Sequence, residues 1–126
     1  MSLTNTYETN TLTWLFTTTA VTRPTGWHVG LFTAAPGEAG GGTEISGNGY
    51  ARISATFTVS GNLATNSGNI EFAAATGSWG TITNAALFDA STGGTMIAYG
   101  TLTASKTIAS GDVFRIPSGD FDITLD

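Results

Sequence analysis

Residues 79–102 constrain the fold more than any other part of this chain. Residues 79–88 carry no charge and mix β-branched, aromatic and small side chains, which is typical of a strand covered on both faces. Asp89 ends the run, and residues 90–94 supply turn-forming serine, threonine and glycine. A second strand is expected at residues 95–102. The sequence therefore predicts a buried hairpin at the centre of a sheet.

Further short strands surround this hairpin. The clearest alternation is at residues 50–59, where Ala51, Ile53, Ala55, Phe57 and Val59 are expected to point into the core. Other strands are expected at residues 27–34, 63–66, 69–73, 113–116 and 121–125, with a short separate segment at 107–109. Turn signals recur about every eight to twelve residues, which indicates an antiparallel sandwich or barrel. We expect an all-β fold, an antiparallel jelly-roll-like β-sandwich.

The N-terminal segment is the one place where a helix is predicted. Asn5 and Glu8 have the spacing of a capping box, and Tyr7, Thr11, Trp14 and Leu15 share one helical face over residues 5–17. This helix is either an arm that inserts Trp14 and Phe16 into a neighbouring molecule or a lid over one end of the sheet, and the lid is favoured. We divide the chain into an arm, residues 1–22, and a β-sandwich domain, residues 23–126.

Residues 35–49 form a long segment with many glycines and few apolar side chains, which indicates a surface loop available for contacts. A phosphate-binding loop is excluded, because neither a strand-to-helix context nor a Gly-Lys-Ser/Thr ending is present.

Composition limits the partners of the chain. Its 126 residues include only 10% charged residues, with a formal net charge of −5. Because this charge lacks the basic footprint of phosphate-backbone binding, nucleic acid is not an expected partner. No apolar run reaches the length of a membrane span, so no membrane is expected either. The surface rich in hydroxyl groups offers little protection against association, and we expect neighbouring subunits, in a homotrimer, to cover part of it.

No catalytic or metal-binding constellation is apparent, and no cofactor is expected. The chain has no cysteine and a single histidine, His28, for which a strand position is favoured over a catalytic one. Glu44, Glu71 and Asp89 could supply a carboxylate pair, but nothing in the sequence fixes their separation. Four aspartates near the C-terminus match no calcium loop, and backbone capping at turns is the favoured role for Asp112 and Asp120. These four are Asp112, Asp120, Asp122 and Asp126.

Tryptophan side chains raise the alternative of sugar binding, since aromatic rings stack on sugars at many binding surfaces. Trp27 and Trp79 are more simply explained as core residues, whereas for Trp14 the two interpretations are equally supported.

Several segments together resemble a known family. These are WHVGLFTAAPG at 27–37, GNGYAR at 47–52, the block from ATGSWGTIT through AYGTLTASK to the Gly-Asp pair at 111–112, and FDITLD at 121–126. The chain resembles small proteins of tailed bacteriophages and prophages that are commonly described as tail-fibre proteins. The resemblance implies a non-enzymatic structural protein, made in the host cytoplasm and carried in the virion.

Two roles follow from this resemblance, capsid decoration (a cement protein) and a tail-fibre or tail-tip component, each acting through contacts with the major capsid or tail proteins. The alternative is a carbohydrate-binding module that recognises a host surface glycan. The candidate partner-binding residues are Tyr7, Trp14, Phe16, Glu38, Glu44, Asn48, Tyr50 and Arg52.

Overall fold

The computed structural model describes residues 1–125 and confirms an all-β protein with one short N-terminal helix, α1 (Asn5–Phe16). Asp126, the last of the four aspartates named above, lies outside the described residues. The strands pair antiparallel throughout residues 1–125, as the sequence predicts for a sandwich. Jelly-roll connectivity stays a prediction.

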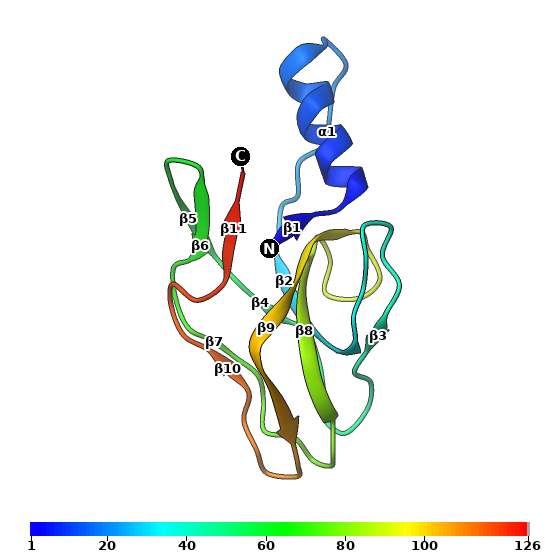
Figure 1. Cartoon of the computed structure of the whole chain (residues 1–126), viewed down its shortest axis with the longest axis vertical. Coiled ribbons are helices and arrows are strands. Elements are labelled where there is room, and N and C mark those ends of the chain that lie inside the picture. Colours follow the sequence, from blue (N-terminus) through cyan, green and yellow to red (C-terminus); the bar gives the residue numbers. More distant parts are fainter. Residues whose placement is uncertain (126) are drawn as a thin grey trace.

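The main sheet holds the central hairpin, with the two longest strands at its middle (Figure 1). Its order is β1 (Ser2–Leu3), β9 (Met96–Ile108), β8 (Gly80–Phe88), β2 (His28–Ala34) and β3 (Thr43–Glu44), and β4 (Ile53–Ser54) also pairs with β2. Two smaller sheets accompany it. One pairs β7 (Ile70–Glu71) with β10 (Arg115–Ile116), and the other has the order β11 (Asp122–Thr124), β6 (Leu63–Asn66) and β5 (Phe57–Ser60).

The predicted hairpin is confirmed as the centre of the main sheet. β8 is buried along most of its length, as its uncharged sequence predicts. At the turn, the Asp89 carboxylate accepts a hydrogen bond from the Thr95 amide at 2.7 Å, and Gly94 has φ +71°. β9 runs on to Ile108, so the separate segment predicted at 107–109 is wrong. The register of β8 with β9 shifts between Ile82 and Asn84, where residues 102–105 of β9 stand opposite the single residue Thr83 of β8.

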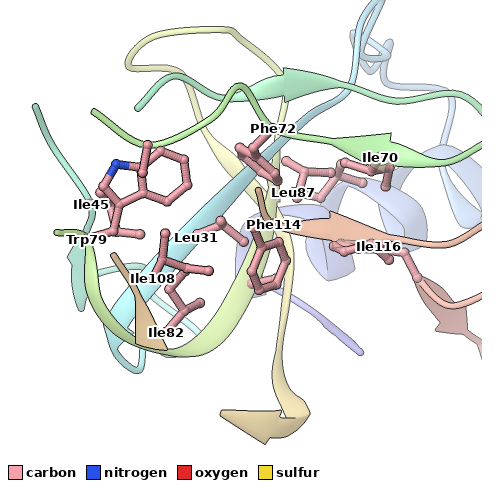
Figure 2. Close-up of a cluster of buried hydrophobic side chains, with 14 of the residues drawn as sticks. Leu31, Ile45, Ile70, Phe72, Trp79, Ile82, Leu87, Ile108, Phe114 and Ile116 are labelled. Atoms are coloured by element: carbon pink, nitrogen blue, oxygen red, sulfur yellow. The ribbon is translucent and has the colours of Figure 1, made fainter. Parts of the chain in front are cut away.

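The core lies between the main sheet and the smaller sheets. In Figure 2, Trp79, Phe72 and Phe114 pack among aliphatic side chains from both layers. Trp79 is 5% exposed, which confirms its core position, and its ring meets Phe72 edge-on. Trp27 is 38% exposed, so the core prediction is wrong for this residue. The reason is its place just before β2, at the end of the sheet where the arm leaves the body.

The single strand predicted at residues 50–59 is wrong. The chain instead forms β4, which pairs with β2, and β5, which pairs with β6 in another sheet. Residues 55–56 form the corner, where the Ala55 amide donates to the Trp27 carbonyl at 2.9 Å. Ile53 and Phe57 still pack on the core as expected, but Val59 is 75% exposed, because the end of β5 lies beyond the body.

The predicted helix is present, but the predicted capping box and the favoured role as a lid are both wrong. Thr4, rather than Asn5, is the N-cap, and its hydroxyl donates to the Met96 carbonyl at 2.7 Å instead of capping the helix. None of the residues Asn5–Phe16 is buried, so the lid interpretation is wrong. α1 projects from one end of the body (Figure 1), and the chain returns beside it to β2.

Candidate functional site

The candidate residues lie in two regions, the helical arm and the loop of residues 35–49 with the segment that follows it. Tyr7, Trp14 and Phe16 belong to α1. Glu44 of β3 forms one hydrogen-bonded cluster with Tyr50 and Arg52, which follow the loop. Glu38 and Asn48 lie elsewhere in residues 35–49.

The cluster begins with a two-point ion pair. Arg52 Nη2 lies 2.8 Å from Glu44 Oε1, and Arg52 Nε donates to Glu44 Oε2 at 2.8 Å. The Tyr50 hydroxyl donates to Glu44 Oε2 at 2.7 Å and accepts the Leu31 amide of β2 at 3.0 Å. Glu44 is held in β3, which pairs with β2. Two parallel hydrogen bonds between a guanidinium and a carboxylate fix the relative orientation of the two groups and also neutralise their charges.

Arg52 also ties the central hairpin to the loop. Its Nη1 donates to the Ala90 carbonyl at 3.0 Å and to the Gly93 carbonyl at 2.8 Å, both in the turn between β8 and β9. Its guanidinium carbon lies 3.5 Å from the centre of the Phe88 ring. With its side chain only 9% exposed, Arg52 joins three segments of this chain. Whether it also meets a partner stays a prediction.

The cluster shifts the acidities of its members. Burial raises the pKa of Glu44, but the hydrogen bonds from Arg52 and Tyr50, with the Arg52 charge, outweigh burial and leave that pKa below its ordinary value. Burial and the hydrogen bond to Glu44 raise the pKa of the Tyr50 hydroxyl. The carboxylate therefore stays charged and the phenol stays neutral at physiological pH.

An open pocket of about 390 Å³ lies beside this cluster. Phe32, Phe88 and Met96 from the main sheet line it, together with Glu44 and the glycines at 40–42. Glu38 also lines it, and its carboxylate accepts the Tyr99 hydroxyl at 2.6 Å. That hydrogen bond raises the pKa of Tyr99.

Asn48 organises its own loop. It has φ +52°, a left-handed conformation that asparagine tolerates better than most residues. Its carbonyl accepts the Trp79 indole N–H at 2.9 Å and the Thr76 amide at 3.0 Å, and its side-chain amide donates to the Ser78 carbonyl at 2.9 Å. These contacts join the loop to the start of the central hairpin.

The base of the arm is anchored to the body. The Thr4 amide donates to the Ile97 carbonyl at 2.9 Å, and the Asn5 amide donates to the Glu38 carbonyl at 3.1 Å. One turn later, the Tyr7 hydroxyl donates to Asp89 Oδ2 at 2.8 Å. Burial, with this hydrogen bond and the Asp89 charge, raises the pKa of Tyr7 to about 12. The first turn of α1 is therefore fixed against the central hairpin.

Beyond this base, the arm exposes large apolar side chains. Trp14 is 64% exposed and Phe16 78% exposed. Leu12 and Leu15 are 59% and 55% exposed. Sequence reasoning did not select these leucines as partner-binding residues, although the apolar run Leu12–Phe16 without charge was the available signal.

His28 lies in a strand, and Asp112 lies at a turn. His28 is half-buried in β2, beside Gly26. Asp112 accepts the Ala109 amide at 2.9 Å, which confirms its turn-capping role. Among residues 1–125, no group of three His, Cys, Asp or Glu side chains is placed to hold a metal ion. The described helix is also too short and too polar to cross a membrane.

The protein is an all-β body that carries an anchored helical arm with exposed aromatic side chains. The particular family is given by comparison with family models. Residues 2–124 match the model described as Podophage GP4 fiber I protein gp80, and the chain belongs to this family. The match confirms the resemblance to phage tail-fibre proteins. A search of curated proteins found no match.

Proposed function

We propose that this protein is a non-enzymatic subunit of a podophage tail fibre, made in the host cytoplasm and assembled into the virion as a homotrimer. In this proposal, residues 1–22 are the arm that binds neighbouring virion proteins, and residues 23–126 are the body that carries it. The loop of residues 35–49 is a second contact region.

The observation that carries the proposal is the exposure of the arm. Four large apolar side chains on one short helix are more than half exposed, whereas Leu87, Phe88 and Ile97 of the central hairpin are buried. Residues 9–22 also carry no charge. Leu12, Leu15 and Phe16 share one side of the helix by their spacing. Because a contiguous exposed apolar surface marks a site of protein association, this side of the arm is suited to binding another subunit.

Replacement of exposed arm residues tests the proposal more cleanly than deletion of the arm. Residues 1–4 include β1 and the buried Thr4, so a deletion would also damage the body. We expect Leu12→Ser with Phe16→Ser to leave the body folded and to reduce incorporation into phage particles at least tenfold, measured by quantitative mass spectrometry of purified virions. Val113→Ser, which alters an exposed valine of the body, is the matched control. Normal incorporation of the double variant would contradict the proposal.

Capsid decoration is the competing virion role. The family description names a fibre, which supports the tail. Immunogold labelling of intact particles separates the two roles, since a cement protein would be labelled over the head and a fibre subunit at the tail.

The pocket beside Glu38 and Glu44 supports a second candidate function, recognition of a host surface glycan. Its lining combines apolar side chains with carboxylates, a combination suited to the apolar face and the hydroxyl groups of a sugar ring. A glycan array probed with the intact protein tests this function, and a Glu38→Gln variant should lose any binding that depends on the pocket. Signals that are equal for both proteins would remove the pocket from this function.

A further inference from the structure

The sheet of β5, β6 and β11 has one apolar face, which begins inside the core. Val59, Ala64 and Ile123 stand opposite one another across the three strands and therefore share this face. One row closer to the body, the rings of Phe57 and Phe121 meet edge-on with centroids 5.8 Å apart, and Phe121 is 1% exposed. The same face therefore belongs to the hydrophobic core at its inner end.

The outer end of this face extends past the body and is uncovered by the described residues. Val59 is 75% exposed and Leu125 is 53% exposed. The Leu125 amide donates to the Asn62 carbonyl at 2.9 Å, which continues the pairing of β11 with β6. A hollow of about 250 Å³ lies along this end, lined by Leu3, Val59, Ile123 and Leu125 among others. We call the surface formed by Val59, Ala64, Ile123 and Leu125 the open sheet face.

The arm carries a second uncovered apolar surface. Leu12, Leu15 and Phe16 fall on one side of α1 by their spacing, and each is more than half exposed. We call these three residues the outer helix face. Trp14 lies on the opposite side of α1, where it borders a pocket with Tyr7 and Val21 of the returning chain.

The two surfaces match in size and in character. Three strands about 4.8 Å apart present a surface about 10 Å wide, which is about the width of a helix. The turn from Leu12 to Phe16 rises about 6 Å, and two residues of strand span about 7 Å. Residues 9–22 and 53–70 carry no charge. Asp122 of β11 alternates with Ile123 and accepts a hydrogen bond from the Thr65 hydroxyl, so its carboxylate lies on the opposite face of the sheet. The contact would therefore bury no ion from either surface. Both surfaces lie at the same end of the molecule (Figure 1).

We propose that the outer helix face of one copy of this protein covers the open sheet face of a second copy. Within one chain, Tyr7 and Asn5 hold the base of α1 to Asp89 and Glu38, and Val59 stays exposed. The contact joins two different surfaces of the protein. A closed assembly therefore forms either from two copies, each of which covers the open sheet face of the other, or from a ring of more copies. A ring of three would be the homotrimer proposed above. The inference rests on the proposed function only in taking the arm as a docking element.

The absence of cysteine from the sequence makes a direct cross-linking test possible. Phe16→Cys and Val59→Cys are prepared as separate proteins, mixed in equal amounts and oxidised under mild conditions. We expect a mixed disulfide between positions 16 and 59, identified on a non-reducing gel and by peptide mass spectrometry. Val113→Cys, in the exposed segment between β9 and β10, replaces Val59→Cys as the control and should not link to position 16 above the background of random collisions. A predominant disulfide between two copies of Phe16→Cys would overturn the inference in favour of helix-to-helix packing, and so would the absence of any specific disulfide.

A charged substitution gives an independent measurement without a cross-link. Val59→Asp should raise the dissociation constant of self-association at least tenfold by analytical ultracentrifugation. Thr58→Asp, which places the same charge on the opposite face of β5, should change it less than twofold. Equal effects of the two variants, or monomers in the unaltered protein at all concentrations, would overturn the inference.

The two proposals can fail separately. If Leu12→Ser with Phe16→Ser blocks incorporation into particles while no disulfide forms between positions 16 and 59, the arm binds a different virion protein, and only the present inference falls. If that disulfide forms but the arm variants enter particles normally, the inference stands and the proposed function falls.

Discussion

The core of the body and the outer part of the arm place their aromatic side chains in opposite environments. In the body, Phe72 is 2% exposed and Trp79 is 5% exposed, and both pack in the cluster of Figure 2. On the arm, Trp14 and Phe16 are mostly exposed. Buried aromatic rings of the body therefore stabilise the fold, whereas the apolar side chains at the outer part of the arm are exposed to solvent. Variants that affect one region without the other test this division.

The largest expected effect comes from the body core. Phe72→Ala should lower the free energy of unfolding by about 3–5 kcal/mol, because a fully buried ring is lost and a cavity replaces it. Urea denaturation followed by tryptophan fluorescence measures this change. A loss below about 1 kcal/mol would show that the core does not dominate stability.

The next effect comes from the ion pair that connects the loop to the central hairpin. Arg52→Ala should cost about 2–4 kcal/mol, because Glu44 and the Ala90 and Gly93 carbonyls lose their partner. Arg52→Lys should recover only part of the loss, since an ammonium group cannot reproduce the two-point pairing. Arg115→Ala, at an exposed position of β10, is the control for a lost positive charge. Equal stability of the Arg52→Ala and Arg115→Ala variants would contradict the structural role of Arg52.

The contribution of Glu44 in this cluster to stability should depend on pH in the acid range. The pKa of Glu44 is lowered in the folded protein, so the stability that its charge contributes is present above the ordinary value of 4.5 and is lost as the pH falls below it. We expect Glu44→Gln to make the free energy of unfolding less dependent on pH between pH 6 and 3, as measured by urea titrations at each pH. An unchanged slope would show that Glu44 does not couple folding to protonation.

A smaller effect is expected where the arm meets the body. Tyr7→Phe removes the hydrogen bond to Asp89 and should cost about 0.5–1.5 kcal/mol. Because the pKa of Tyr7 rises from 10.0 to about 12 on folding, the stability from its neutral hydroxyl is complete below pH 10 and is lost as the pH rises towards 12. The variant should therefore lose less stability than the unaltered protein between pH 10 and 12. Parallel losses for the two proteins over that range would contradict this contact.

The smallest effect is expected at Phe16 of the arm, and it can be compared directly with that of Phe72 in the body core. At protein concentrations too low for self-association, Phe16→Ser should change the free energy of unfolding by no more than about 0.5 kcal/mol, because its ring is 78% exposed in the single chain. The matched measurement is the urea denaturation used for Phe72→Ala, at the same low concentration. A loss above about 2 kcal/mol there would show that Phe16 packs against its own body.

The sequence predicted those parts of the fold that depend on local pattern. The absence of charge from residues 79–88 identified β8, and the glycines after Asp89 identified the turn of the central hairpin. The helix also followed from its spacing. Its cap did not, because the Thr4 hydroxyl is engaged by Met96, a residue of β9 far away in the sequence.

The open sheet face could not be predicted, because Val59 has the same alternation as the core residues before it. Its exposure depends on where the body ends in space, and no local pattern records that position. Sequence reasoning did select Glu44, Tyr50 and Arg52 for possible partner contacts. That they bind one another depends on the pairing of β3 with β2, which places Glu44 within reach.

The connection of the arm to the main sheet has a mechanical consequence. The chain enters α1 from β1, which pairs with β9, and leaves it towards β2, which pairs with β8. Both ends of the arm are therefore held in one sheet, with two strands, β9 and β8, between them. A force applied to the tip of the arm would be divided between two strand pairings, β1 with β9 and β2 with β8, instead of acting on a single strand.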